Sequence, residues 1–197
     1  MHKFLFELGV EELPDSVLMP FQEAIVQSFK KLCLDSQIGY TDLAFGSTPR
    51  RIFLKVSGLP SAQPDARIVK LGPATKIAYA PDGQLSNAGM GFLQKSGGTE
   101  QDLRIQPTDK GEFICVDYIQ TGKAVIDLLK EWIPEAILQI PLPKKMIWRS
   151  QDLAFSRPIR WIVALYDREI IPLDFFGISS GRETQANRFL GPDQGIT

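Results

Sequence analysis

The stretch Ser47–Val56, with the sequence STPRRIFLKV, combines a proline turn, two adjacent arginines and an apolar run. Proline fixes one backbone dihedral and removes a hydrogen-bond donor, so the chain is stiff just before the arginines. The residues from Arg50 to Ser57 are predicted to form a strand, in which Arg50 and Arg51 project in opposite directions. Two guanidinium groups held there suit recognition of phosphate or carboxylate, although solvated arginines at a strand end give the same pattern.

The segments before this stretch predict an opening unit of strand, helix, strand and strand. Phe4–Gly9 is typical of a buried strand that ends at a glycine. Between Pro14 and about Ser36, apolar residues recur every three or four positions, which indicates an amphipathic helix. Tyr40–Gly46 predicts a strand joined to the next by a short turn. The order is compatible with half of a ferredoxin-like fold, which is an analogy at the level of the fold.

The middle of the chain predicts shorter elements. Arg67–Leu71 indicates a strand ended by Gly72-Pro73, and Ser86–Lys95 a short helix weakened by glycines. Thr99 and Asp102 have the spacing of a weak capping box. Glu112–Gln120 is rich in residues that favour strands.

The remaining pattern predicts a helix over Ala124–Trp132, interrupted at Pro134 and resuming to Ile140. A hairpin is predicted from Pro158–Tyr166 and Ile170–Phe176. Together the elements indicate an α+β protein with mainly antiparallel sheets, helices on one face and two small subdomains. We expect an N-terminal unit at 1–65, a mixed α/β segment at 66–140 and a basic, β-rich segment at 141–197.

The composition is that of an ordinary globular protein. The chain has 197 residues, a net charge of −1, 44% hydrophobic residues and 23% charged residues. Any contact with nucleic acid must therefore come from a local basic surface. No apolar run approaches the ~20 residues of a membrane span, and the N-terminus does not resemble a targeting peptide. We expect a cytoplasmic protein that does not contact membranes.

Candidates for catalysis or metal binding are few in this sequence. The cysteines, Cys33 and Cys115, and the single histidine, His2, lack the spacing of a zinc site, so no metal site is predicted. No phosphate-binding loop occurs, and Gly89-Met90-Gly91 lacks the rest of a dinucleotide motif. No catalytic residue and no bound cofactor are predicted. The adjacent Glu11 and Glu12 suit a helix N-terminus, or else a cation or a basic partner.

The second half of the chain has a basic character that the whole chain lacks. Between residues 144 and 188, eight lysines and arginines stand against five acids, with aromatic residues interleaved. Arginine beside aromatic rings is typical of RNA-binding surfaces and of protein interfaces, although Trp148 and Trp161 more often mark a core. The candidate residues for binding RNA or a protein partner are Arg50, Arg51, Lys144, Lys145, Arg149, Arg157, Arg160, Arg182 and Arg188.

Five segments carry a resemblance to a known family: FELGVEELP (Phe6–Pro14), STPRRIFLKVSGL (Ser47–Leu59), PLPKKMIW (Pro141–Trp148), FSRPIRWIVAL (Phe155–Leu165) and GRETQANRFLGP (Gly181–Pro192). In this order, they resemble the N-terminal region of the β subunit of bacterial tetrameric glycyl-tRNA synthetase. Two positions depart from the family pattern. Asn187 stands where a histidine is usual, and Ile147 stands where an arginine is frequent.

The resemblance implies a role in attaching glycine to tRNA as part of a glycine–tRNA ligase. The implied partners are the α subunit, in an α2β2 heterotetramer, and glycine tRNA. Glycine activation with ATP and magnesium belongs to the α subunit, so this region is expected to be non-catalytic and inactive alone. The family's HD-type and anticodon-binding regions are missing from the sequence. The alternatives are a stand-alone RNA-binding module and a purely structural scaffold; an editing-like hydrolytic pocket has the least support.

Overall fold

The computed structural model describes residues 1–148, 154–186 and 196, and the chain divides into two compact units. Unit 1 comprises Met1–Gln63 and Lys123–Thr197, and unit 2 comprises Pro64–Gly122. This division differs from the consecutive segments expected at 1–65, 66–140 and 141–197. The physical reason is strand pairing across the whole chain, because the first strand lies beside a strand near residue 160.

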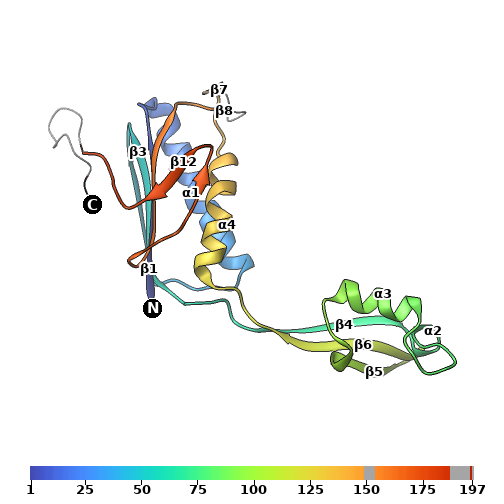
Figure 1. Cartoon of the computed structure of the whole chain (residues 1–197). Coiled ribbons are helices and arrows are strands. Elements are labelled where there is room, and N and C mark those ends of the chain that lie inside the picture. Colours follow the sequence, from blue (N-terminus) through green and yellow to red (C-terminus); the bar gives the residue numbers. More distant parts are fainter. Residues whose placement is uncertain (149–153, 187–195, 197) are drawn as a thin grey trace. The chain divides into compact units, whose positions relative to one another are not determined.

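A mainly antiparallel sheet forms one layer of unit 1 (Figure 1). Strand β1 at its centre pairs antiparallel with β3 on one side and β9 on the other, and β2 pairs with β3. The short strand β12 adds to β9 in parallel, while β11 pairs with β12 and β10 with β9. The bounds are β1 (His2–Val10), β2 (Asp42–Thr48), β3 (Arg51–Leu59), β9 (Ile159–Tyr166), β10 (Glu169–Ile170), β11 (Asp174–Phe175) and β12 (Ile178–Gly181).

Two helices, α1 (Asp15–Asp35) and α4 (Val125–Leu138), lie against one face of this sheet (Figure 1). The chain order β1-α1-β2-β3-α4-β9, with the sheet order β9-β1-β3-β2, is the ferredoxin-like split βαβ arrangement. The α+β class, the antiparallel sheets and the helices on one face are thereby confirmed. Helix α4 runs through Pro134 without interruption, because burial of residues such as Trp132, Ile133 and Ile137 holds both halves against the core.

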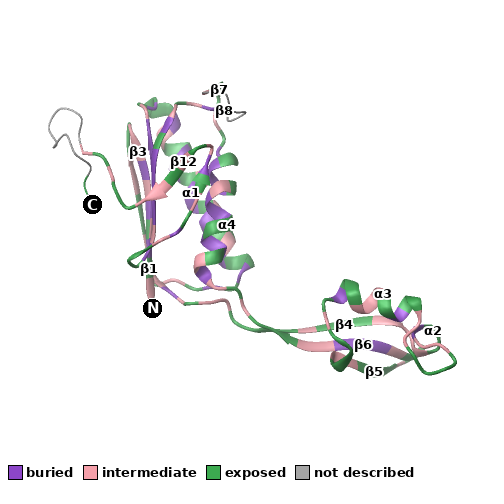
Figure 2. Ribbon diagram, viewed as in Figure 1, coloured by how far each residue is buried: buried purple, intermediate pink, exposed green. Residues whose placement is uncertain are grey.

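The core of unit 1 lies between the sheet and the two helices (Figure 2). Alternate residues of β1 point into it, and Phe4, Phe6 and Leu8 are at most 1% exposed. Phe29 of α1 meets Trp132 of α4 edge to face, with ring centroids 5.5 Å apart. The indole nitrogen of Trp132 donates to the Ser28 hydroxyl at 2.9 Å, so the buried ring keeps a polar partner.

Unit 2 is a three-stranded antiparallel sheet with the order β4-β6-β5, together with two short α-helices and a 3₁₀ turn. A bulge between Leu71 and Ala74 carries the first strand through Gly72-Pro73, where the sequence predicted an end. The bounds are β4 (Ala66–Ala74), α2 (Thr75–Ala78), α3 (Asn87–Ser96), η1 (Glu100–Asp102), β5 (Leu103–Thr108) and β6 (Gly111–Gln120).

Local capping fixes the ends of α3 and η1. The Ser86 hydroxyl accepts a hydrogen bond from the Gly89 amide, and Gly97 ends the helix in the left-handed conformation, with φ 79°. The predicted capping box of Thr99 and Asp102 is confirmed, and the Thr99 amide donates to Asp102 at 2.7 Å. Its hydrogen bonds with Thr99 hold the pKa of Asp102 below its usual value.

The predicted hairpin after residue 158 is confirmed in its first strand, β9, and in its turn, but its second strand is much shorter than predicted. Asp167 turns the chain with φ 53° and accepts a hydrogen bond from the Lys3 amide. In the predicted second strand only Glu169–Ile170 pairs antiparallel with β9, while Asp174–Phe175 pairs with β12 instead. A further two-stranded ladder joins β7 (Met146–Ile147) to β8 (Ala154–Phe155). In the described parts of the chain, no helix is long and apolar enough to cross a membrane.

Candidate functional site

Three predicted arginines meet at one end of the unit 1 sheet, around Glu11–Glu12. Nη2 of Arg50 lies 3.8 Å from one carboxylate oxygen of Glu11, and Nε of Arg160 lies 3.2 Å from the other. Nε of Arg157 donates to the backbone carbonyl of Glu12 at 3.1 Å. The cluster forms because β1 ends where β3 and β9 begin, so residues from three distant segments share one edge.

Backbone hydrogen bonds fix the chain at this end of the sheet. The amide of Val10 donates to the carbonyl of Arg50 at 2.9 Å, and the amide of Glu11 donates to that of Pro158 at 3.0 Å. For the pair Glu11 and Glu12, the sequence left open a helix N-terminus, a cation or a basic partner. The structure shows that Glu11 contacts arginines of its own chain. Nε of Arg50 is buried without a hydrogen-bond partner in the described parts of the chain. Arg160 is more accessible than Arg50, with 49% of its side chain exposed against 21%.

Lys144 and Lys145 lie in the loop before β7, at the same end of unit 1 (Figure 1). The contact between Phe155 of β8 and Phe21 of α1, at 5.8 Å between centroids, fixes this ladder beside the start of α1. Both lysines are exposed, and neither forms an ion pair with any described residue. We call the group Arg50, Lys144, Lys145, Arg157 and Arg160 the basic end.

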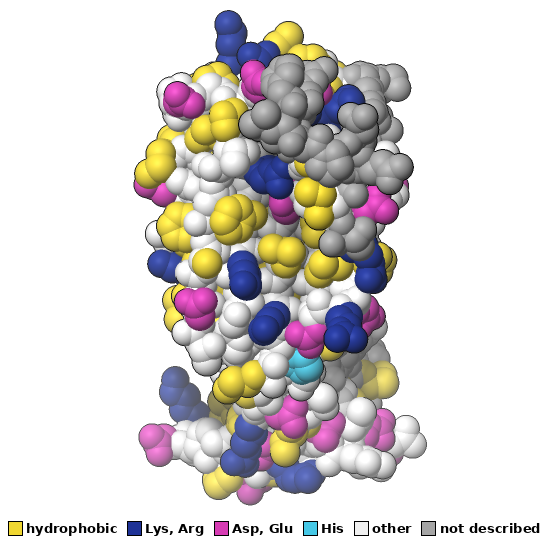
Figure 3. Space-filling model, turned by 90° about the vertical axis from the view of Figure 1, so that its left-hand side faces the viewer, with side chains coloured by type: hydrophobic (Ala, Val, Ile, Leu, Met, Phe, Trp, Pro, Cys, Tyr) yellow, Lys and Arg dark blue, Asp and Glu magenta, His cyan; other side chains and the backbone are white. Residues whose placement is uncertain are grey.

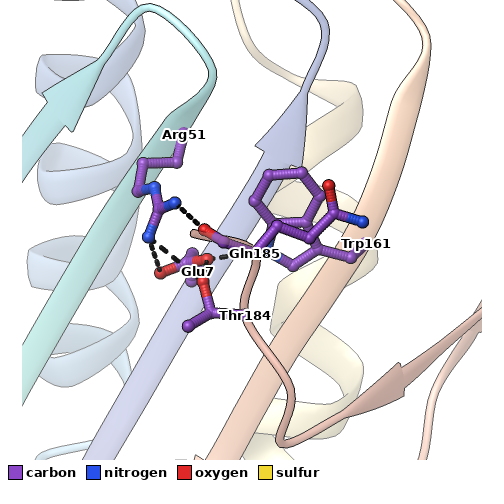
Figure 4. Close-up of polar contacts among 5 residues, drawn as sticks. All are labelled: Glu7, Arg51, Trp161, Thr184 and Gln185. Atoms are coloured by element: carbon purple, nitrogen blue, oxygen red, sulfur yellow. Dashed lines mark hydrogen bonds and ion pairs between the residues drawn. The ribbon is translucent and has the colours of Figure 1, made fainter. Parts of the chain in front are cut away.

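Arg51 belongs to a different cluster, on the sheet face opposite the helices (Figure 4). Its Nη1 lies 3.5 Å from a carboxylate oxygen of Glu7 and donates to the Thr184 hydroxyl at 3.1 Å. Its Nη2 donates to the Gln185 carbonyl, and its guanidinium carbon lies 5.7 Å from the ring centroid of Trp161. We call Glu7, Arg51, Trp161, Thr184 and Gln185 the Glu7 cluster.

Glu7 is the centre of that cluster, with only 11% of its side chain exposed. The indole nitrogen of Trp161 donates to its Oε1 at 2.6 Å, and the Thr184 hydroxyl donates to the same oxygen. The buried carboxylate is therefore satisfied by one ion pair and two hydrogen bonds. Because Arg51 is committed to this network, the structure separates it from Arg50, its neighbour in the sequence.

The other candidates lie apart from the basic end or outside the described residues. Nη2 of Arg182 donates to the carbonyl of Arg168 at 3.2 Å, which ties the chain after β12 to the turn after β9. Arg149 and Arg188 fall outside the described residues, as does Asn187, one of the two departures from the family pattern. The other departure, Ile147, lies in β7 and is 67% exposed.

The two tryptophans of the basic segment are structural. The indole nitrogen of Trp148 donates to the Phe155 carbonyl at 2.9 Å while the ring packs against the core, and Trp161 is 8% exposed. Sequence reasoning missed Glu7, Thr184 and Gln185. One signal was available for Glu7, because a lone acid inside the apolar strand FLFELGV must find a partner when the strand is buried.

Among the described residues, no group of three or more His, Cys, Asp or Glu side chains could hold a metal ion. Cys33 and Cys115 are both buried and unbonded. Burial raises the pKa of the Cys33 thiol to about 11. That thiol is therefore protonated at neutral pH, which is the opposite of what a nucleophilic or metal-binding cysteine requires.

Comparison with known proteins defines first the class and then the family. The residues 4–197 match a family of aminoacyl-tRNA synthetase subunits, described as "Glycyl-tRNA synthetase beta subunit". The chain belongs to this family and corresponds to its N-terminal region.

Curated relatives agree with this assignment. The glycine–tRNA ligase beta subunit of Geobacter sulfurreducens is 40% identical over 194 residues, which cover 96% of this chain and 28% of the relative. Those of Oleidesulfovibrio alaskensis and Chromohalobacter salexigens are 36% and 37% identical, covering 98% and 96% of this chain and 28% and 27% of the relatives. The chain thus spans little more than a quarter of their length.

Proposed function

We propose that this region supports the attachment of glycine to tRNA as a non-catalytic part of the glycyl-tRNA synthetase β subunit, by contacting tRNA at the basic end. The observation that carries the proposal is the convergence of Arg50, Arg157 and Arg160, with Lys144 and Lys145 in the loop before β7 at the same end of unit 1 (Figure 1). Family membership supports it, because the relatives are named as ligases of glycine and tRNA.

The two kinds of cation have different parts in this proposal. Glu11–Glu12 hold the arginines in fixed directions, so little side-chain entropy is lost when an outward-facing guanidinium meets a phosphate. Lys144 and Lys145 are exposed, so their charge is available to a polyanion. Phosphate contacts of this kind position an RNA without reading its sequence.

The chemistry of the reaction is assigned elsewhere in this proposal. Glycine activation with ATP and magnesium takes place on the α subunit of an α2β2 heterotetramer in the cytoplasm, and this region alone is inactive. Its contribution is to bring glycine tRNA and the α subunit together.

Assembly with the α subunit is a second role that a specific observation favours. Met146 and Ile147, directly after the two lysines, are 51% and 67% exposed. Leu138, the last residue of α4, is 51% exposed. Apolar side chains beside a basic rim have the composition of a protein interface. The scaffold role and the tRNA role therefore concern neighbouring surfaces and are separable by mutation.

The test uses the complete heterotetramer with the double substitution Lys144→Glu/Lys145→Glu in the β subunit. We expect the affinity for glycine tRNA to fall about tenfold, because two charge-assisted contacts become repulsive. The slope of log K against log salt should become shallower by about 1.5, since each neutralised phosphate contributes about 0.7 on a single strand and about 0.9 on a B-form duplex. Fluorescence anisotropy with labelled tRNA over a salt series measures both quantities.

The matched control is Lys30→Glu/Lys130→Glu, which reverses two exposed lysines on α1 and α4. It should leave both quantities unchanged. Unchanged tRNA binding in the first variant would overturn the tRNA role. For the scaffold role, Met146→Ser/Ile147→Ser should weaken association of the subunits in sedimentation velocity without altering tRNA affinity of the intact tetramer. Normal assembly of that variant would overturn the scaffold role.

A further inference from the structure

The sheet face of unit 1 that points away from α1 and α4 carries an apolar block in its middle. In the antiparallel register, Leu5 of β1 lies opposite Leu165 of β9. Glu7 of β1 lies between Phe53 of β3 and Val163 of β9. The half-buried side chains of Leu5, Phe53 and Leu165 therefore lie around the buried Val163, and we call this surface the open face. Figure 3 shows apolar side chains gathered across it, with lysines and arginines among them.

The two central strands have the composition of strands that are covered on both sides. In β9 the residues Trp161–Tyr166 are apolar at every position, and β1 carries Leu5 between Phe4 and Phe6. An antiparallel sheet with one wet face normally alternates apolar and polar residues. The edge strand β2 carries Asp42, Ala44 and Gly46 on the open face. The double-sided apolar pattern is thus strongest at the middle of the sheet.

Phe53 is shaped for packing on this surface. A Cβ atom at Gly46, its partner on β2, would lie 2.8 Å from the Phe53 ring, so the ring covers that glycine. Its outer side stays partly exposed among the described residues. A ring held in this way presents a fixed apolar surface at little entropic cost.

The chain itself indicates what lies against the open face. After β12, Thr184 and Gln185 cross onto this face and are held there by Glu7 and Arg51 (Figure 4). Ile196 then pairs with Thr184 through two backbone hydrogen bonds of 2.7 and 2.8 Å. The relatives continue well beyond this region, which corresponds to 28% of their length. In these longer relatives, the polypeptide that follows this region starts from a segment corresponding to Ile196, which is paired with Thr184 of the Glu7 cluster.

We infer that the open face is the surface on which the following part of the same β subunit packs, and that the Glu7 cluster anchors the start of that cover. Covalent connection gives the following polypeptide a high effective concentration at this face. An RNA is a poorer fit, because Lys3 lies on the same row as Asp42 and beside Asp167, whose carboxylate accepts from the Lys3 amide. The inference rests on family membership and does not depend on the tRNA contact proposed above.

The first test measures accessibility at Lys55, an exposed open-face position, in the full-length β subunit without α subunit or tRNA. The variants Lys55→Cys and, as control, Lys130→Cys are labelled with a maleimide, and each site is read by mass spectrometry. We expect Lys55→Cys to react at least about tenfold more slowly, because the cover must open before the thiol is reached. Comparable rates at the two sites would overturn the inference.

Three other outcomes also overturn it by naming a different occupant. Protection that arises only on adding the α subunit assigns the face to that subunit. Protection only on adding glycine tRNA assigns it to RNA, and protection that grows with β-subunit concentration assigns it to a second copy. If the tRNA test at Lys144 and Lys145 failed, the expected protection of Lys55→Cys would not change. The proposed tRNA contact and the proposed cover of the open face can therefore be refuted independently.

A second measurement needs no substitution. Hydroxyl-radical footprinting of the unaltered full-length subunit compares Phe53 with Phe45, which has the same intrinsic reactivity and is 48% exposed on edge strand β2. We expect modification of Phe53 to be at least about tenfold below that of Phe45. A ratio within about threefold, as partial exposure alone would give, would contradict the inference even if the cysteine variants misfold.

Discussion

The ring of Trp161 occupies the space in which a side chain at position 9 would stand. Gly9 and Trp161 are directly opposite in the β1–β9 pairing, and a Cβ atom at Gly9 would lie 2.0 Å from ring carbons of the indole. This close approach lets the indole nitrogen reach Glu7 at 2.6 Å. A glycine in the middle of the sheet is therefore a condition for the Glu7 cluster.

Substitution of that glycine should be strongly destabilising. We expect Gly9→Ala to lower the free energy of unfolding by about 3 kcal/mol. The indole ring of Trp161 must move away from position 9, and the Glu7 carboxylate then loses a hydrogen-bond donor. Gly39→Ala is the matched control, since nothing lies within 4 Å of a Cβ atom there. Urea denaturation of both variants measures the difference, and similar midpoints would show that the ring can move freely.

Arg51 should matter for stability and not for tRNA binding. We expect Arg51→Met to cost about 3 kcal/mol of unfolding free energy, because it leaves the nearly buried Glu7 carboxylate without its cation. Adding Glu7→Gln to this variant should restore part of the loss, since the uncompensated charge is removed. Chemical denaturation gives the energies. Loss of tRNA affinity in a folded tetramer carrying Arg51→Met, at unchanged stability, would contradict this assignment.

The Cys33 thiol should be inert and should make stability depend on alkaline pH. Burial raises its pKa from the ordinary 9.0 to about 11, so the folded state holds the proton more tightly than the unfolded state. The contribution of the protonated Cys33 thiol to the free energy of unfolding is fully present below pH 9 and is lost as the pH rises towards 11. Between pH 9 and pH 11 the free energy of unfolding should therefore fall more steeply with pH for the wild type than for Cys33→Ala. Denaturation curves of both proteins at several pH values measure this difference.

Alkylation checks the same thiol independently. At pH 8.5, iodoacetamide should modify Cys33 at least about tenfold more slowly in the folded protein than in urea, because the thiolate is rare and the site is 5% exposed. Rapid modification of the folded protein would show that the site opens readily.

Unit 1 should fold without unit 2. The residues that flank the insertion are already paired, with the Gln63 amide donating to the Lys123 carbonyl at 2.9 Å and Ala62 bridged to Ala124. All members of the large core cluster belong to unit 1. Replacing residues 64–122 by Asn-Gly, which favours a tight hairpin turn, should thus give a cooperatively melting protein. A broad transition by circular dichroism would show that unit 1 depends on the insertion.

Local patterns were sufficient for several elements of the fold. The spacing of Val17, Phe21, Ile25 and Phe29 predicted α1, and the apolar run after the proline turn at Pro49 predicted β3, because both depend on neighbours a few residues apart. The edge strand β5 was missed, since its residues Arg104, Gln106 and Pro107 are exposed and lack a strand pattern. The interruption predicted at Pro134 was wrong, because packing against the core outweighs the lost backbone hydrogen bond.

The sequence by itself determined the α+β class, the opening order of elements and, through its long matching segments, the family. Only the tertiary structure decided which partners Arg50 and Arg51 contact. Arg50 and Arg51 are neighbours in the chain, yet Arg50 faces Glu11 and Arg51 faces Glu7. The difference arises because β1 pairs with β3 and β9 at one particular register, and that register brings together residues more than a hundred positions apart.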